Sequence, residues 1–396
     1  MLEFFSASTR MVNSRNAMSE CMDSALGSDK SCDLVIVHAS IGHDFAALVG
    51  RARELAPGAR VLGASCCGIV GREGVSESMK DVAIMALRGQ QLAVAHVADI
   101  NGRNAYAKAA EMAQQLRAAQ PGINMVHFLA SGIDIANDRC IAGFESVLGP
   151  EVTIFGATSS DNMHGVVSYQ MVDDQVFEHG AWAVGFADPS LQVDTQATHG
   201  FLAAGGPMPV TRAEGTRLIE LDGRSAWQVY TQRLGLDAAT ATCGDTIPVG
   251  ALAEELPAAL AAEYGNAHIL RVVTRRDADG TMHYPTEIQT GTRLWLTARD
   301  EGRIFSDMDR MMNQMASRAG GDKPVAVFHA DCLARGRFLF NRVMKEELVS
   351  RMQYPLSTDG VPPPWLGMYG FGEFARLGGS NTYHNYTTAL YAIYRK

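Results

Sequence analysis

Two turns combine small, hydroxyl and thiol side chains at the ends of apolar runs. They are Gly63-Ala64-Ser65-Cys66-Cys67-Gly68-Ile69 and Gly156-Ala157-Thr158-Ser159-Ser160-Asp161-Asn162. Small residues let a ligand approach the backbone, and loops at the carboxyl ends of strands are where α/β sheets bind ligands. The two turns could form a pseudo-symmetric cradle, or they could simply end two crowded strands. The binding candidates in them are Ser65, Cys66, Gly68, Ser159 and Asn162.

A second segment places charge and a thiol between an apolar run and an expected helix. The run 324–328 leads into His329-Ala330-Asp331-Cys332-Leu333-Ala334-Arg335-Gly336. A loop between a strand and a helix N-terminus can hold an anion, and arginine adds a charged fork. A cysteine near a helix start can also have a lowered pKa. The candidates are Cys332, Arg335 and Gly336; the alternatives are a buried cysteine with a surface arginine, or a catalytic pair of Cys332 with His329.

A third segment, Gly367-Met368-Tyr369-Gly370-Phe371-Gly372-Glu373-Phe374, is followed by 381–387. Its glycine spacing is no dinucleotide fingerprint, because no βαβ unit follows; it is typical of a strand against which something packs closely. The candidates are Tyr369, Glu373 and Asn385. We predict that the loop 329–336 and the segment 369–373 line one pocket. Arg335 and Glu373 would then bind opposite ends of a small zwitterion, or each other.

Composition excludes several classes of protein. The 396 residues carry a net charge of −9 and are 47% hydrophobic, so a phosphate-binding basic face and a nucleic-acid partner are not expected. No apolar run approaches the ~18 residues of a membrane helix. The first residues lack a signal-peptide pattern, and seven scattered cysteines make no disulfide framework. The histidine and cysteine spacings match no zinc motif. We expect a cytoplasmic protein with reduced thiols.

The elements that would position these segments are partly duplicated. Three matched pairs of segments keep their order: they begin at Arg15 and Arg103, Leu34 and Met125, and Val61 and Ile154, with offsets of 88, 91 and 93 residues. A repeat of this length indicates half-domains. We predict halves of about 9–98 and 99–198, in which 9–65 and 97–158 superpose and the strands 33–40 and 124–130 are equivalent. Each repeats helix, strand, helix, strand: first 9–26, 33–40, 42–55 and 60–65, then 103–118, 124–130, 134–148 and 152–158.

Beyond 203–215, a predicted linker rich in glycine and proline, the pattern changes. We expect a helix at 224–235, a hairpin over 268–288 and a strand at 293–298. A helix at 303–318, a strand at 324–330, a helix near 337–352 and strands at 367–375 and 383–394 complete the chain. The predicted fold is an internally duplicated, layered α/β N-terminal domain with mixed sheets (1–220), followed by an α+β C-terminal domain (221–396).

With these motifs the chain resembles the FIST family, which has an N-terminal and a C-terminal FIST domain. The resemblance extends over nearly the whole length. It rests on the turn 63–68, Asp222-Gly223-Arg224-Ser225-Ala226, the loop 329–336, the segment 370–373 and His384-Asn385-Tyr386-Thr387. It implies an intracellular sensor of small ligands in bacterial signal transduction, with amino acids as suggested ligands. Some free-standing members are haem proteins that sense nitric oxide and act through a partner histidine kinase.

Two classes of function follow. The first is a sensor that acts through a partner, such as a histidine kinase or another signalling protein, with either haem b or an amino acid as its ligand. If haem is bound, we expect His329 or His384 as the axial ligand, because both lie beside polar loops at strand ends. The second class is an enzyme that uses Cys332 or Glu373. The sensor is favoured because no nucleophile or acid/base triad spacing is evident.

Overall fold

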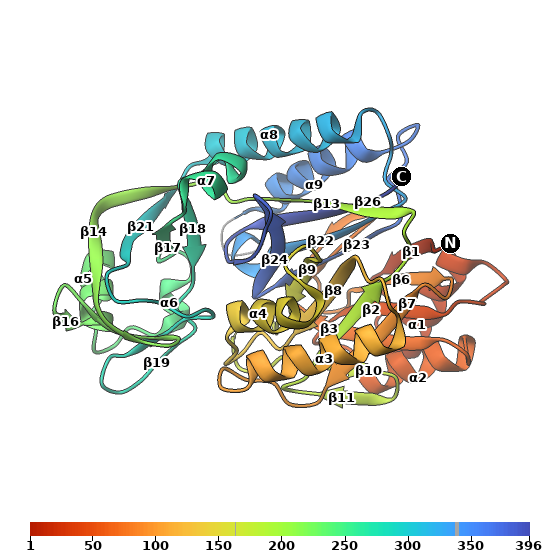
Figure 1. The fold of residues 1–396 in the computed structure, drawn as a ribbon, viewed down its shortest axis with the longest axis horizontal. Coiled ribbons are helices and arrows are strands. Elements are labelled where there is room, and N and C mark those ends of the chain that lie inside the picture. Colours follow the sequence, from red (N-terminus) through yellow and green to blue (C-terminus); the bar gives the residue numbers. More distant parts are fainter. Residues whose placement is uncertain (163, 337–339) are drawn as a thin grey trace.

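The computed structural model describes residues 1–162, 164–336 and 340–396. Within these residues, three six-stranded sheets form the sides of a prism, and an eight-stranded sheet belongs to a smaller body beside it (Figure 1). Each side of the prism carries two helices on its outer face. The inner faces of the three sheets share one hydrophobic core. The protein is therefore a layered α/β structure with mixed sheets.

One unit of strand, helix, strand, helix, strand, hairpin and strand builds the prism three times. The first unit contains β1 (Glu3–Thr9), α1 (Ser14–Leu26), β2 (Leu34–Ser40), α2 (Phe45–Leu55), β3 (Arg60–Cys66), β4 (Ile69–Gly71), β5 (Gly74–Ser76) and β6 (Val82–Arg88). The second contains β7 (Leu92–Val97), α3 (Ala105–Ala119), β8 (Met125–Ala130), α4 (Asn137–Leu148), β9 (Thr153–Thr158), β10 (Gln170–Val172), β11 (Gln175–Phe177) and β12 (Ala181–Phe186).

The third unit has the same order but is interrupted after its first strand. It contains β13 (Leu191–Thr198), α8 (Glu301–Ala319), β22 (Ala326–Cys332), α9 (Arg342–Leu356), β23 (Trp365–Gly370), β24 (Gly372–Leu377), β25 (Ser380–His384) and β26 (Thr388–Arg395). The interruption, residues 201–299, is the smaller body, which we call the insert. It contains β14 (Phe201–Glu214), β15 (Arg217–Leu221), β16 (Arg224–Ser225), α5 (Ala226–Leu234), α6 (Cys243–Thr246), β17 (Leu252–Glu255), α7 (Ala258–Tyr264), β18 (His268–Arg271), β19 (Arg275–Arg276), β20 (Met282–His283) and β21 (Arg293–Arg299).

The units exchange their hairpins in a closed cycle. Each sheet has a parallel central pair, β2 with β3, β8 with β9 or β22 with β23. Hairpin β4–β5 pairs with β23 of the third unit, β10–β11 with β3 of the first, and β24–β25 with β9 of the second. No unit completes its own sheet, so the three depend on one another for their strand pairing.

The same cycle recurs in the backbone where the three central strands end. Cys67 N–H donates to the Tyr369 carbonyl (3.1 Å), Ser160 N–H to the Ser65 carbonyl (3.0 Å) and Phe371 N–H to the Thr158 carbonyl (3.2 Å). These equivalent bonds confirm the predicted duplication, since 33–40 and 124–130 occupy equivalent places as β2 and β8. They also reveal a third copy that we did not predict.

Helix starts follow ordinary capping chemistry. Asn13, Asp44, Asp300 and Asn341 each accept a hydrogen bond from a backbone N–H three residues on, at the starts of α1, α2, α8 and α9. The helix expected at 9–26 therefore begins only at Ser14, after the unpredicted strand β1. The helix expected near 337–352 begins at Arg342, and 337–339 lie outside the described residues.

Two further expectations in the insert were wrong. The predicted linker 203–215 lies largely in β14, a long strand that pairs with both β15 and β21. Its glycines and proline coincide with a register shift between Ala204 and Met208 instead of ending the strand. The hairpin expected over 268–288 is shorter than predicted: β19 and β20 form it around the expected turn, whereas β18 pairs with β17. The domain division at 220 stays a prediction.

Candidate functional site

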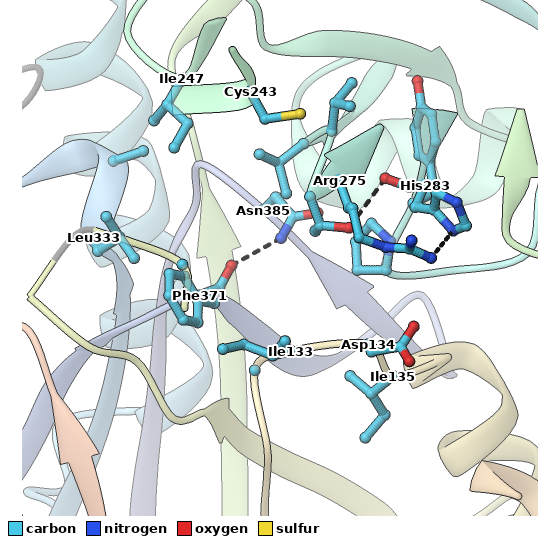
Figure 2. Close-up of a pocket in the computed structure, with 18 of the residues that line it drawn as sticks. Ile133, Asp134, Ile135, Cys243, Ile247, Arg275, His283, Leu333, Phe371 and Asn385 are labelled. Atoms are coloured by element: carbon cyan, nitrogen blue, oxygen red, sulfur yellow. Dashed lines mark hydrogen bonds between the residues drawn. The ribbon is translucent and has the colours of Figure 1, made fainter. Parts of the chain in front are cut away.

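A cavity of about 200 Å³ lies where the insert meets the prism (Figure 2). The prism contributes the loop 132–135 after β8 and the residues 332–334 at the end of β22. It also contributes Phe371, Tyr383, Asn385 and Tyr386. The insert contributes residues from α6 and from the segments 272–275 and 283–285. Side chains from remote parts of the chain therefore meet around one space.

Hydrogen bonds between the insert and the prism frame this cavity. Asn137 Nδ2 donates to the Pro285 carbonyl (3.1 Å), and Tyr386 Oη donates to the Ile247 carbonyl (2.9 Å). Arg271, which is paired with Glu254 at 2.9 Å, also donates to the carbonyl of Tyr383 at 2.8 Å. Because these bonds join cavity residues or their neighbours, they fix the distance between the two walls.

One end of the cavity is polar. Arg275 contacts Asp277 (2.8 Å) and the Nδ1 atom of His283 (3.3 Å), while His283 Nε2 lies 2.8 Å from Asp277. Figure 2 shows the Arg275 guanidinium beside the His283 ring, with Asp134 below them. Asp134 is exposed and has a left-handed backbone (φ 51°), a conformation that aspartate tolerates better than most residues. The acids and bases at this end offer both signs of charge to a ligand.

The other end is apolar, with one amide. Leu333, Phe371 and Ile247 line it, and Asn385 lies beside them (Figure 2). Asn385 is fully buried, and its Nδ2 donates to the Phe371 carbonyl at 3.0 Å. Its Oδ1 has no hydrogen-bond partner among the described residues. A buried acceptor without a partner is rare in proteins, so it marks this end of the cavity.

Cys332 also lines the cavity, and behind it lies a buried charge cluster. Arg335 pairs with Asp331 at 2.8 Å, donates to the His199 carbonyl at 3.0 Å and is only 2% exposed. Burial raises the pKa of Asp331 to about 6, although Arg335 lowers it. Burial, followed by the charge of Asp331, raises the pKa of Glu373 well above its usual range. The charge of Arg335 thus lowers the pKa of two buried carboxyl groups, Asp331 and Glu373, while burial raises both.

The same surroundings make Cys332 a poor nucleophile. Burial, followed by the nearby Glu373, raises the pKa of its thiol well above the ordinary value. The thiolate is the reactive form of cysteine. No hydrogen bond joins Cys332 to a histidine within the described part of the chain, and the bond of His329 runs instead to Thr388. A catalytic Cys332–His329 pair therefore finds no support in the geometry.

The second and third sequence motifs meet at this cavity. Cys332, at the end of the strand β22, lies in the same wall as Phe371 and Asn385. Because β22 and β23 are parallel neighbours, the segments that follow them emerge at one sheet edge. Arg335 and Glu373 do not face each other across the cavity as predicted: Arg335 is taken by Asp331. Tyr369 is packed in the core under α8 and α9.

The first motif lies at the centre of the prism instead. Ser65 donates to the Ser160 carbonyl (2.8 Å) and accepts from Tyr169 N–H (2.8 Å). Ser159 donates to the Ala130 carbonyl (3.1 Å), and both serines are wholly buried. The two turns lie together, as their symmetry suggested, but the hydroxyl groups of Ser65 and Ser159 bond to backbone groups of the protein. Cys66 is buried beside them, and Asn162 is partly exposed.

The two predicted glycines lie against one carboxylate. A Cβ on Gly336 would come within 2.1 Å of Glu77 Oε1, and one on Gly68 within 2.7 Å of the Glu77 side chain. Glu77 also forms an ion pair with Lys345. The absence of a side chain at 68 and 336 therefore makes room for Glu77, and neither glycine lines the cavity.

The two histidines proposed as haem ligands lie outside the cavity. His329 Nε2 is 2.9 Å from the Thr388 hydroxyl, and His384 Nε2 is 2.7 Å from the Thr382 hydroxyl. Burial lowers the pKa of each ring to about 3. The void beside His329 measures about 10 Å³, space for roughly one water molecule. An axial histidine needs an apolar slot beside it, so these two residues do not fit a haem group here.

Sequence reasoning missed the insert side of the cavity. Arg275, His283 and Ile247 lie in a stretch that we interpreted only as a hairpin and its surroundings. The turn at Asp277 was recognised, but no pattern indicated that the residues flanking it face the prism. The described residues contain no group of three or more metal-ligating side chains. Among the helices described, none is long and apolar enough to span a membrane.

Comparison with known proteins agrees with the motifs. Residues 33–224 match the FIST N domain and 226–376 match the FIST C domain. No curated protein matches the chain. Among solved structures, a cyanuric acid hydrolase from A. caulinodans is 6% identical with a TM-score of 0.36, over 100% of this chain and 99% of that one. PurLQS from Thermotoga maritima is 9% identical with a TM-score of 0.22, over 100% and 72%.

Proposed function

The chain belongs to the FIST family, whose domains are sensory modules of signalling proteins, and on that premise we propose that it binds a small molecule in the cavity between the insert and the prism. The observation that carries the proposal is the composition of the wall. Residues of the FIST N match (132–135) and of the FIST C match (332–334) line the same space. Mostly apolar walls with a few polar groups are typical of small-molecule sites.

A ligand in this position would act as a bridge. It would contact the prism loops and the insert segments at the same time. Its binding free energy would therefore favour the arrangement in which the insert lies against the prism. β14 and β21 connect the insert to the prism, so a change at the cavity could alter how the insert presents its surface. We propose a signalling protein as the partner that reads this change, with a histidine kinase as the candidate that the family resemblance implies.

A cavity-filling substitution tests the proposal. Ile133 lines the cavity and is only partly buried, so Ile133→Trp should fill the space without disturbing the core. Val176→Trp, on the exposed strand β11 and outside the cavity wall, is the matched control. A small-molecule library is screened by thermal shift against the full chain and both variants. We expect compounds that stabilise the wild type and the control but not Ile133→Trp. Equal stabilisation of all three, or of none, would reject the site.

The family resemblance implies two more specific candidates for the ligand. In the first, the ligand is haem b and the signal is nitric oxide; in the second, it is an amino acid. The placement of His329 and His384 gives the first no support, whereas the mixed charges around Arg275 and Asp134 are compatible with a zwitterion. An absorbance spectrum of the purified protein separates them, because only the haem form is coloured.

A further inference from the structure

We infer that the apolar end of the cavity, beside Asn385, is a recognition subsite for a neutral hydrogen-bond donor. The donor would be a hydroxyl or an amide N–H carried by a compact aromatic ligand. The inference rests on the proposed function, because it concerns the same cavity. It adds the chemical class of the ligand and the atom that selects it. That atom is Oδ1 of Asn385, which is fully buried, belongs to a cavity-lining side chain and has no partner among the described residues.

The orientation of the Asn385 amide is fixed by its neighbour. The Phe371 carbonyl is an acceptor only, so the amide group 3.0 Å from it must be the nitrogen. The oxygen is therefore left as the free acceptor. Gly372 permits this arrangement, since a Cβ there would lie 2.9 Å from Asn385 Nδ2 and 1.9 Å from Tyr383 Oη. The residue that precedes Glu373 thus makes room for the selecting side chain.

An unpaired acceptor in an apolar wall discriminates by hydrogen bonding. A ligand donor would satisfy Oδ1, whereas an aliphatic or ether group would leave it unpaired and bury it further. Sites that hydrogen-bond a substrate group reject analogues that lack it, because their own polar groups stay unpaired. The subsite is therefore expected to distinguish a hydroxyl from a methyl group of similar size.

The charges around the subsite favour a neutral donor over an ammonium. Arg335 lies behind this wall, and its guanidinium is held by Asp331 and the His199 carbonyl. Both oxygens of Glu373 are buried without a hydrogen-bond partner among the described residues, and burial raises the pKa of this carboxyl group, which disfavours it as a counter-charge. An ammonium would enter an apolar site whose nearby ion pair, Arg335 with Asp331, is already formed and offers it no free counter-charge. Unpaired charge in such a site is strongly unfavourable.

The size and lining of the cavity favour an aromatic body. Phe371, Tyr383 and Tyr386 are aromatic residues of the wall beside Leu333 and Ile247. An apolar protein cavity of about 150 Å³ binds benzene, so a cavity of about 200 Å³ accepts a substituted ring. Offset and edge-on packing against the aromatic wall would orient such a ring.

Four matched probes test the inference by calorimetry on the full chain. They are p-cresol (a neutral donor), 4-methylanisole (an acceptor without a donor), p-xylene (neither) and 4-methylbenzylammonium (a charged donor). We expect p-cresol to bind at least about tenfold more tightly than each of the others, a difference of about 1.4 kcal/mol. Asn385→Leu should remove this preference. Asn313→Leu, the same change at an exposed position of α8 outside the cavity wall, should preserve it.

The outcomes separate the inference from the proposed function. If p-xylene or 4-methylanisole binds as tightly as p-cresol, and Ile133→Trp blocks them all, the cavity is a ligand site but the donor subsite is refuted. Tighter binding of 4-methylbenzylammonium would refute the neutral donor. If no probe binds, the inference fails, while the library screen still decides whether the cavity binds other molecules. The wild-type series is sufficient by itself even if Asn385→Leu does not fold.

Discussion

The strongest quantitative prediction concerns the buried pair of Asp331 and Arg335. Substitution of Arg335 by methionine keeps an unbranched side chain of similar length but removes the cation. It leaves the carboxylate of Asp331, which is 5% exposed, without a counter-charge. Removing one partner of a buried pair usually destabilises a protein by about 3–5 kcal/mol. We expect Arg335→Met to lower the free energy of unfolding by about 4 kcal/mol at pH 8.

The sign of the pH dependence follows from the pKa of Asp331. Burial raises it to about 6 in the folded wild type, above the unfolded value of about 3.9. A raised carboxyl pKa means that its contribution to stability is present at low pH and is lost as pH rises through the folded pKa. Without Arg335 this pKa rises further, so the loss continues above pH 6, at up to about 1.4 kcal/mol per pH unit. The variant should therefore recover about half of its deficit at pH 6.

Urea unfolding followed by tryptophan fluorescence at pH 6 and pH 8 measures both effects. The matched control is Arg342→Met, because Arg342 and Glu346 form a pair of the same i,i+4 spacing at 2.7 Å, with 83% of the arginine side chain exposed. That variant should leave the unfolding midpoint unchanged. A deficit for Arg335→Met below about 1 kcal/mol, or one that is equal at the two pH values, would refute the buried-charge reasoning.

Three other predictions can be checked with the same material. Glu373→Gln should become more stable relative to the wild type as pH rises from 4.5 to 7, because the raised pKa of Glu373 makes the wild type lose stability over that range; parallel pH profiles would contradict this. Gly156→Ala should destabilise by about 2–4 kcal/mol, since its φ is 137° and a Cβ would lie 2.0 Å from the Phe128 carbonyl oxygen. Gly149→Ala, with φ 90° and open space, should cost only about 1 kcal/mol, and equal losses would disprove the close approach. Reconstitution with haem b should give a Soret band that survives His329→Ala and His384→Ala, or no band at all; a band lost in either variant would restore that histidine as the ligand.

Local sequence patterns predicted the elements that are evenly buried along their whole length. β2 and β8 are continuous apolar runs because both of their faces are covered, and such runs are visible without knowing the partner. The repeat spacing was sufficient to pair the first two units, since their loops have similar lengths. The same logic placed the loop 329–336 beside the segment 369–373, because parallel neighbouring strands end at one sheet edge.

Long-range packing decided the rest. The third unit was hidden because the insert 201–299 separates β13 from α8, so no constant offset remains. The hairpin exchange involves strands of three to six residues whose partners lie in other units, and short strands carry no signal of their partner. In a strand buried on both faces, polarity does not reveal where a side chain points. Only the folded chain shows that Arg335 pairs with Asp331 and that Asn385 lines the cavity. The same holds for the hydrogen bond of Ser65 to the Ser160 carbonyl, which joins the first two units.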